Sequence, residues 1–425
     1  MSDGGPSQLP ACAKCGACST VCPVYRVSGR EYHTGRGKLH LLSRLEPGDA
    51  SATMAEILSH CLLCGACSAV CSRGIPVAEQ LAAARAELTR RAGCHPLWRR
   101  LTSGALSHPR LLSTLAPLAR RLAGQHIPAS SGLPLRLGVT TAVPELPPPA
   151  AAADNEQPAA AQPTQAWLFS GCYTAYLDPA GKQAITTLLD PADQGSVAIA
   201  ADWHCCGLAA YSGGQLDQAR ELARRNIAAH AGTAPIIVGC ASCAAHLSRY
   251  PQLLADDPQW YPRARDFAAR LNEFSQYLAD RLPATPAGAN QEERETASRA
   301  APLRVLYHDP CHLRFHLPTT APPRQLLAAT GGVELVELPG GPRCCGHGGL
   351  FQLAHPETAA AILDELAAAF RQSTAEVVTS TCSGCLLQWQ RAQNQGLHNG
   401  RVVHLATLLA WLSAGHNKPA TTCGF

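Results

Sequence analysis

The chain has 425 residues, which is enough for two or three domains with separate hydrophobic cores. Apolar residues make up 46% and charged residues 16%, a balance that is typical of a folded protein and excludes an intrinsically disordered chain. The formal net charge is only +4 and no long run of Lys and Arg occurs, so nucleic acid is not the expected partner.

The twenty cysteines are the most unusual feature of the composition. Residues 1–12 do not form a basic segment followed by an apolar one, so no secretory signal is predicted. No run of about 18 apolar residues predicts a membrane span. A cytoplasmic location is therefore expected, where disulfides are rare. In that compartment the spacing of the cysteines favours metal ligation.

Residues 1–95 contain two cysteine runs of the form C-x2-C-x2-C-x3-C. This spacing is typical of a domain with two [4Fe–4S] clusters, in which the fourth cysteine of each run binds the other cluster. The runs predict an α-helical, two-[4Fe–4S] ferredoxin-like domain. One cluster is expected on Cys12, Cys15, Cys18 and Cys71, and the other on Cys61, Cys64, Cys67 and Cys22. The alternative, a pair of zinc knuckles, leaves the third evenly spaced cysteine of each run unexplained.

Two helical segments belong to this first part of the chain. Residues 30–42 predict a basic helix, whose Arg36 and Lys38 either offset the charge of a cluster, face a partner or are simply solvated. An Ala-rich helix is expected over residues 77–91. Neither segment by itself indicates a reaction.

The remaining segments outside the repeats predict connections. Cys94 has no neighbouring cysteine and is expected to be a buried or free thiol. Leucine periodicity predicts a helical connector over 96–141, and Pro/Ala-rich composition predicts a linker over 142–165. Residues 284–302 are polar and aperiodic, which predicts a second linker, and residues 414–425 are expected to form a tail.

A pattern of five cysteines occurs twice, about 140 residues apart. The first copy contains Cys172, Cys205, Cys206, Cys240 and Cys243, and the second contains Cys311, Cys344, Cys345, Cys382 and Cys385. Internal repetition at this length predicts two copies of one domain, over residues 166–283 and 303–413.

Short apolar runs in both copies lead into cysteine-bearing turns and then into helices. The runs expected to be strands are 166–170, 235–239, 303–308 and 375–379. Amphipathic, Ala-rich helices are expected over 216–230 and 356–372. Such alternation predicts α/β domains with largely parallel sheets. Because the carboxyl ends of parallel strands share one edge, cysteines distant in sequence are expected to meet there.

The order Cys, Cys-Cys-Gly, C-x-x-C in each copy resembles the cysteine-rich (CCG) domain. That family includes the catalytic subunit of heterodisulfide reductase and iron–sulfur subunits of glycolate oxidase, of lactate-utilisation dehydrogenases and of anaerobic glycerol-3-phosphate dehydrogenase. The whole layout looks most like the glycolate oxidase iron–sulfur subunit. The resemblance implies an α+β multidomain fold, in which the α-helical ferredoxin-like domain is followed by two tandem α/β CCG domains.

The resemblance also implies cofactors for the two repeats. Complete five-cysteine sets hold non-cubane [4Fe–4S] clusters in heterodisulfide reductase, so one or two further clusters are expected here. Zinc in a CCG domain is an alternative, because four cysteines suffice for it. Histidines near the cysteine loops either shuttle protons or only donate hydrogen bonds and pack. They are His204, His308, His312 and His347.

The function that the resemblance implies is electron transfer, as the iron–sulfur subunit of a flavin-dependent glycolate or lactate dehydrogenase. No G-x-G-x-x-G motif follows a predicted strand, so an FAD-binding partner subunit is expected. The acceptor would be a quinone or another carrier, and partners could bring the chain to the inner face of the membrane. The alternative is a thiol or heterodisulfide reductase subunit with catalytic clusters in the CCG domains. A non-enzymatic metal-binding protein is a third reading.

Overall fold

The computed structural model describes residues 12–45, 51–92, 164–190, 196–282 and 302–414. Cys94 and the expected connector over 96–141 lie outside these residues. So do nearly all of the two expected linkers and of the tail. None of the helices in the described ranges is long and apolar enough to cross a membrane.

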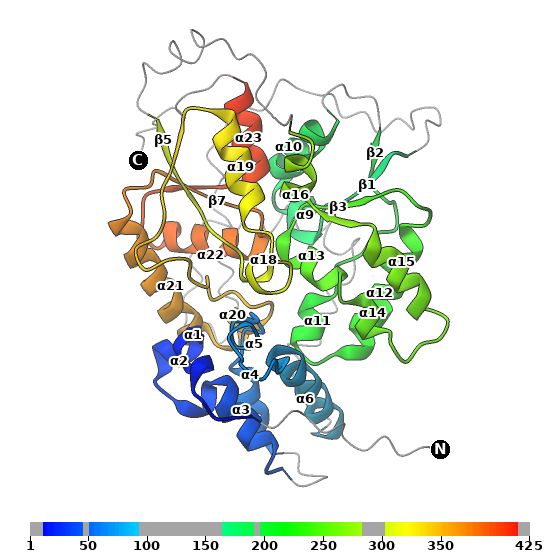
Figure 1. Ribbon diagram of the computed structural model, residues 1–425, viewed down its shortest axis with the longest axis vertical. Coiled ribbons are helices and arrows are strands. Elements are labelled where there is room, and N and C mark those ends of the chain that lie inside the picture. The colour runs from blue at the N-terminus through cyan, green and yellow to red at the C-terminus, as the bar shows by residue number, and fades with distance from the viewer. Residues whose placement is uncertain (1–11, 46–50, 93–163, 191–195, 283–301, 415–425) are drawn as a thin grey trace, which may run out of the picture.

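The N-terminal part is a small helical domain, drawn in blue in Figure 1. Its elements are α1 (Ala17–Val21), α2 (Pro23–Ser28), the 3-10 helix η1 (Glu31–His33), α3 (Gly35–Leu42), α4 (Ala52–Ser59), α5 (Ala66–Ala69) and α6 (Val77–Ala92). Apolar side chains of α4 and α6, such as Leu58 and Leu81, form its core. The cysteine runs interrupt the chain, and therefore several of its helices span only one or two turns.

The first repeat folds as an α/β domain. Its elements are β1 (Ala166–Phe169), α9 (Cys172–Tyr176), α10 (Pro179–Leu189), β2 (Val197–Ala198), α11 (Leu208–Ser212), α12 (Leu216–Ala229), β3 (Ile236–Val238), α13 (Ala241–Leu247), α14 (Tyr250–Leu253), α15 (Tyr261–Ala269), β4 (Leu271–Glu273) and α16 (Phe274–Ala279). The four parallel strands have the order β2-β1-β3-β4. The central strands β1 and β3 are apolar because helices cover both of their faces.

The second repeat has the same topology. Its elements are β5 (Leu303–Tyr307), α18 (Cys311–Phe315), α19 (Ala321–Thr330), β6 (Val333–Leu335), α20 (Phe351–Ala354), α21 (Pro356–Gln372), β7 (Val377–Ser380), α22 (Ser383–Asn394), β8 (Arg401–His404) and α23 (Leu405–Ser413). The parallel strands have the order β6-β5-β7-β8, which repeats the order of the first copy. The expected fold class is thus confirmed.

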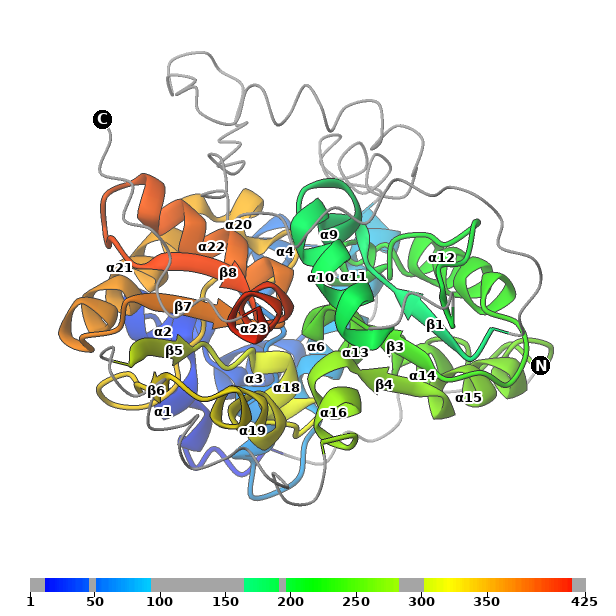
Figure 2. The same ribbon diagram turned by 90° about the horizontal axis from the view of Figure 1, so that it is seen from above.

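The two α/β domains pack side by side through equivalent helices (Figure 2). Helix α10 of the first copy packs on α23 of the second, and α16 of the first packs on α19 of the second. Since α10 and α19 occupy matching places in the two copies, as do α16 and α23, the interface is nearly self-complementary. This arrangement turns the cysteine loops of the two sheets toward each other.

The N-terminal domain lies against both repeats at the end where the cysteine loops gather (Figure 1). Arg26 of α2 forms an ion pair with Glu365 of α21 at 2.7 Å. On the side of the first repeat, Arg85 donates to the Ser212 carbonyl oxygen at 2.9 Å. Contacts with both copies therefore fix the position of the N-terminal domain.

Candidate metal centres

The first three cysteines of the first run and the last cysteine of the second run line one cavity, to which Cys67 also contributes. Cys12 and Cys15 precede α1, Cys18 lies in its first turn, and Cys71 follows α5. Helices α1 and α5 are in contact, which brings these distant segments together. The backbone N–H of Arg36 donates to Cys18 Sγ at 3.3 Å, so the first turn of α3 supplies a hydrogen bond to a sulfur.

The second cysteine run and Cys22 line another cavity of the same domain. Cys61, Cys64 and Cys67 contribute the other sulfurs. Cys22 Sγ caps α2 by accepting the N–H of Tyr25 at 3.4 Å. Burial raises the pKa of the Cys64 and Cys67 thiols. Holding such buried sulfurs as thiolates requires a positive group nearby, which a soft metal centre supplies.

The two N-terminal loops share a strained backbone feature. Lys14 has φ 55° and Leu63 has φ 52°, and each residue stands directly before a cysteine, Cys15 or Cys64. Left-handed backbone is unfavourable for residues with a side chain and persists only where the surroundings enforce it. The two C-x-x-C loops therefore share one backbone conformation, which sets the direction of their cysteine side chains.

A buried cation adjoins the second cavity. Lys38 is only 1% exposed, and its Nζ donates to the His33 carbonyl oxygen at 2.5 Å. Within the described ranges it forms no ion pair with a carboxylate. Burial lowers the pKa of Lys38, whereas the sulfurs of Cys61 and Cys22 raise it. An uncompensated buried ammonium costs several kcal/mol, so this surrounding fits an anionic iron–sulfur cluster bound by thiolates.

The five cysteines of the first repeat form a continuous set of sulfur contacts. The sulfur of Cys172 interacts with that of Cys205, Cys205 with Cys206, and Cys206 with Cys243, which in turn interacts with Cys240. The interactions with Cys172 and Cys206 lower the pKa of Cys205 well below its usual value. The pKa of Cys240 is lowered well below its usual value as well, by its contacts with Cys243 and Cys382. A dense group of thiols with readily ionised members is suited to a soft metal or an iron–sulfur cluster.

The second repeat contains the same set. Cys311 contacts Cys344, Cys344 contacts Cys345, and Cys345 Sγ lies 3.4 Å from Cys385 Sγ, which contacts Cys382. Hydrogen bonds from its two neighbours lower the pKa of Cys344 well below its usual value. All five predicted cysteines of each copy are thus brought together.

The glycine of each Cys-Cys-Gly motif has a conformational role. Gly207 has φ 93° and Gly346 has φ 81°, in the region that side chains disfavour. A Cβ on Gly346 would also lie 3.2 Å from the carbonyl oxygen of Ala359. The glycine lets the chain turn sharply from two adjacent cysteines into the following helix or turn.

The two repeats meet at the first cysteine of each C-x-x-C motif. The sulfurs of Cys240 and Cys382 interact with each other across the domain interface. Ser242 Oγ lies 3.0 Å from Cys382 Sγ, and Ser383 hydrogen-bonds Cys240 in return. Sequence reasoning missed both serines, although each stands between the cysteines of its own motif. Their effect depends on the domain interface, which no local pattern indicates.

The second N-terminal cavity also adjoins the second repeat. The sulfur of Cys64 interacts electrostatically with those of Cys344 and Cys311. At the same junction, the His316 Nε2 lies 3.3 Å from the carbonyl oxygen of Leu63. The four groups of cysteines therefore form a series, in which the cysteines of the second repeat lie between those of the N-terminal domain and those of the first repeat.

The histidines near the cysteine loops differ in their surroundings. His204 contacts a neighbouring backbone carbonyl, and His312 Nδ1 lies 2.9 Å from Ser242 Oγ. Burial lowers the pKa of His308 and His347 to about 4 and that of His312 to about 3. Neutral rings suit hydrogen bonding or ligation better than they suit the storage of a proton.

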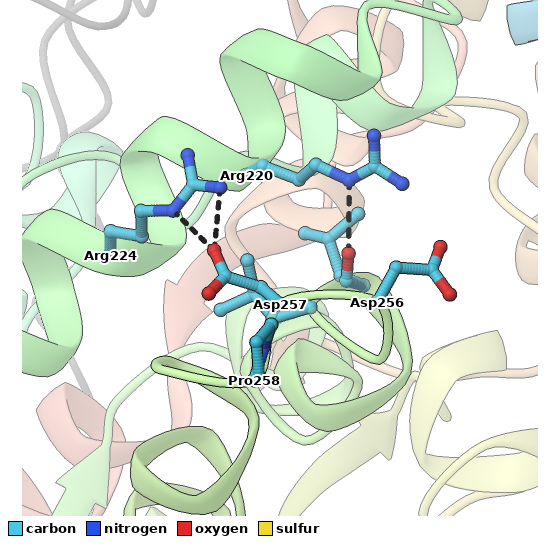
Figure 3. Close-up of a pocket in the computed structure, with 7 residues that line it drawn as sticks. Arg220, Arg224, Asp256, Asp257 and Pro258 are labelled. Atoms are coloured by element: carbon cyan, nitrogen blue, oxygen red, sulfur yellow. Dashed lines mark hydrogen bonds and ion pairs between the residues drawn. The ribbon is translucent and has the colours of Figure 1, made fainter.

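A surface pocket on the first repeat contains none of the cysteines. Arg220 and Arg224 lie on one side of it, with Asp256 and Asp257 on the other (Figure 3). Arg224 donates two hydrogen bonds to Asp257 Oδ2, at 3.2 and 2.9 Å, and Arg220 donates to the carbonyl oxygen of Leu253. Its charges are largely balanced internally, so we assign no chemistry to it.

Comparison with known families agrees with this architecture. Residues 8–75 match the family described as a 4Fe-4S dicluster domain. Residues 166–248 and 305–390 both match the family described as a cysteine-rich domain. The matches cover the N-terminal cysteine runs and each of the two repeats.

Several proteins are similar to much or all of the chain. The probable glycolate oxidase iron-sulfur subunit of Bacillus subtilis (strain 168) is 31% identical over 434 residues, covering 96% of this chain and 95% of that protein. Lactate utilization protein A of Exiguobacterium sp. is 33% identical over 245 residues, covering 57% of this chain and 95% of its own. Lactate utilization protein A of B. subtilis is 27% identical over 205 residues, covering 48% and 82%. Together with the dicluster fold and the two CCG domains, the first likeness shows that this chain belongs to the family of glycolate oxidase iron–sulfur subunits.

Proposed function

We propose that the chain is the iron–sulfur electron-transfer subunit of a flavin-dependent 2-hydroxy-acid dehydrogenase that acts on glycolate or lactate. The observation that carries this proposal is the unbroken series of four cysteine groups through three domains. Iron–sulfur clusters, once bound, accept and release single electrons. Placing such groups next to one another is what an electron-transfer subunit requires.

The proposal assigns cysteines to four clusters. The first two are [4Fe–4S] clusters, one on Cys12, Cys15, Cys18 and Cys71, the other on Cys61, Cys64, Cys67 and Cys22. Each CCG domain would hold a further, non-cubane cluster on its five cysteines, with zinc as the alternative. The two cavities support the first two assignments, with Cys67 lining both of them, and the sulfur contacts within each repeat support the others.

The relatives' names guide the choice of substrate and partner. They are called a glycolate oxidase subunit and a lactate utilization protein, so a 2-hydroxy acid is the proposed substrate of the whole complex. An FAD-binding dehydrogenase subunit would take electrons from it, and a quinone or another carrier would accept them from this chain. Peripheral association with the inner face of the membrane, through these partners, completes the proposal.

The proposal is tested by reconstitution. The chain, purified without air together with an FAD-binding dehydrogenase subunit of the same organism, should reduce a quinone analogue when glycolate or lactate is added. The flavoprotein alone should reduce the analogue much more slowly. Iron analysis should give about sixteen irons per chain if all four sites are filled, and about eight if only the N-terminal pair is. A complex with full iron that transfers no electrons from either acid would refute the function.

A second candidate is a thiol or heterodisulfide reductase subunit. The observation that favours it is the completeness of both five-cysteine sets and their contact through Cys240 and Cys382. If it holds, the isolated chain should reduce a mixed disulfide with a reduced viologen dye as electron donor. Absence of that turnover in a preparation with about sixteen irons per chain would leave the hydroxy-acid function standing.

A further inference from the structure

The two CCG domains differ at a position directly beside the cysteines. His308 precedes Cys311 by three residues, and Phe169 precedes Cys172 by the same interval. Phe169 ends β1, and His308 follows directly on β5, which is the equivalent strand. The second copy therefore places an imidazole where the first copy places a hydrocarbon ring.

The backbone holds His308 in a fixed place. Its N–H donates to the Thr379 carbonyl oxygen at 2.8 Å, and its own carbonyl oxygen accepts from Ser380 Oγ at 2.9 Å. The ring packs edge-on against Trp389, with centroids 5.7 Å apart. The residue is only 2% exposed. These contacts fix the imidazole in the interior of the second repeat.

A ring nitrogen of His308 lies near two of the cysteine sulfurs. This nitrogen, Cys345 Sγ and Cys385 Sγ all lie within 4.8 Å of one another, and the two sulfurs are 3.4 Å apart. Metal–nitrogen and metal–sulfur bonds of about 2.0 and 2.3 Å separate tetrahedral ligands by roughly 3.3–3.8 Å. The three atoms would have to close by at most about 1.3 Å to share one metal ion.

One ring nitrogen of His308 is also left without a partner. Nε2 is buried, and no hydrogen bond to it occurs in the described part of the chain. A buried polar atom in that condition costs about 1–3 kcal/mol. Its lone pair would be satisfied by a metal ion. Cys345 and Cys385, whose sulfurs lie near a ring nitrogen of His308, are both buried and free of disulfides.

We propose that His308 is a metal ligand of the second CCG domain, where it shares an ion with Cys345 and Cys385. The second site is then a mixed nitrogen and sulfur site, whereas the first, with Phe169, has thiolates only. This deepens the proposed function: the ion is an iron of the second-copy cluster. Replacing a thiolate ligand by a nitrogen ligand raises the reduction potential of an iron–sulfur centre. The two CCG sites should therefore differ in reduction potential.

The experiment labels only the histidines of the complete, cluster-loaded chain with nitrogen-15 and records pulsed EPR spectra of its paramagnetic states. Directly bound nitrogen should give a strong hyperfine coupling. His308→Phe copies the residue of the first repeat, so it should be tolerated, and it should abolish the coupling. His312→Asn is the matched control: the Nδ1 of this ring also lies near a cysteine sulfur, 3.8 Å from Cys311 Sγ, but it lies 2.9 Å from the Ser242 hydroxyl, which satisfies it. The coupling should survive it.

The outcomes separate this inference from the proposed function. A strong coupling in the wild-type chain that is lost only with His308→Phe establishes the ligand. A coupling that is absent from a chain with about sixteen irons, or that persists in His308→Phe, overturns the inference and leaves electron transfer intact. If the second site holds zinc and its X-ray absorption spectrum shows an imidazole ligand, His308 is still a metal ligand. The proposed function then has three clusters and no fourth.

Discussion

At the scale of single residues, the charge buried beside the second N-terminal cavity has a measurable consequence. Lys38→Met removes an ammonium close to Cys61 and Cys22 while nearly conserving volume. A reduced cluster carries one more negative charge, so loss of this cation should lower its reduction potential. At an effective dielectric constant near 20, the attraction between this ammonium and the added electron is worth about 2 kcal/mol. Its loss should lower the reduction potential by roughly 50–100 mV. EPR-monitored redox titration measures it.

Arg36 provides the matched control for Lys38. Its side chain is about one-third exposed, forms an ion pair with Glu31 and lies near the first N-terminal cavity. Solvent screens such a charge, so Arg36→Gln should shift the potential of the second cluster far less. Equal shifts in the two variants would show that Lys38 has no special effect.

Within the second repeat, an ion pair holds the loop that follows β5. Arg324 on α19 donates two hydrogen bonds to Asp309, at 2.8 and 2.7 Å, and Asp309 is 4% exposed. Arg324→Met leaves that carboxylate buried without a partner, which should cost about 3 kcal/mol. For a domain of about this size the thermal midpoint should fall by roughly 9–18 °C, as followed by circular dichroism.

The outer partner of Arg324 supplies the comparison. Glu337 also accepts from Arg324, at 2.9 Å, but its side chain is 55% exposed. Glu337→Gln should therefore change stability by less than about 1 kcal/mol. In the double variant Arg324→Met/Asp309→Asn much of the lost stability should return, because no uncompensated charge remains. A double variant as unstable as the single one would contradict this explanation.

The elements also show how far the sequence predicts the fold. Strands β1, β3, β5 and β7 were predicted because each is an apolar run ending near a cysteine turn. The edge strands β2, β4, β6 and β8 were missed. β2 has two residues, β4 reads Leu-Asn-Glu and β6 Val-Glu-Leu, and β8 begins the apolar stretch that continues into α23. β2, β4 and β6 are short and partly solvated, so their composition carries little signal, whereas β8 is mostly buried but cannot be told from the start of the helix that follows it.

At the site, the sequence predicts the membership of each cysteine group but not the relation between groups. Spacing within a run or a repeat indicates ligands, since local geometry limits which sulfurs can converge. The meeting of Cys240 with Cys382, and of Cys64 with Cys344, depends on how whole domains pack. The same holds for Lys38, because the sequence does not distinguish a lysine buried among sulfurs from a solvated lysine on a helix.

At the scale of the whole molecule, the domain interface should let each repeat influence the metal centre of the other. Ser242 of the first copy contacts Cys382 of the second, and Ser383 of the second contacts Cys240 of the first. A hydroxyl donated to a cluster sulfur stabilises the reduced form. Ser242→Ala should therefore lower the potential of the second-copy cluster, and Ser383→Ala that of the first. Redox titration that found each serine acting on its own copy would contradict this.

The series of cysteine groups makes a final prediction about magnetic coupling between clusters. Cys64 of the N-terminal domain interacts with Cys344 and Cys311 of the second repeat, and the first repeat follows through Cys240. Dipolar coupling falls steeply with distance. Reducing the N-terminal clusters should thus speed electron-spin relaxation at the second repeat much more than at the first. Cys344→Ser, which disturbs the middle site, should leave relaxation at the first repeat nearly unchanged. Faster relaxation at the first repeat than at the second would mean that the repeats are placed in the opposite order.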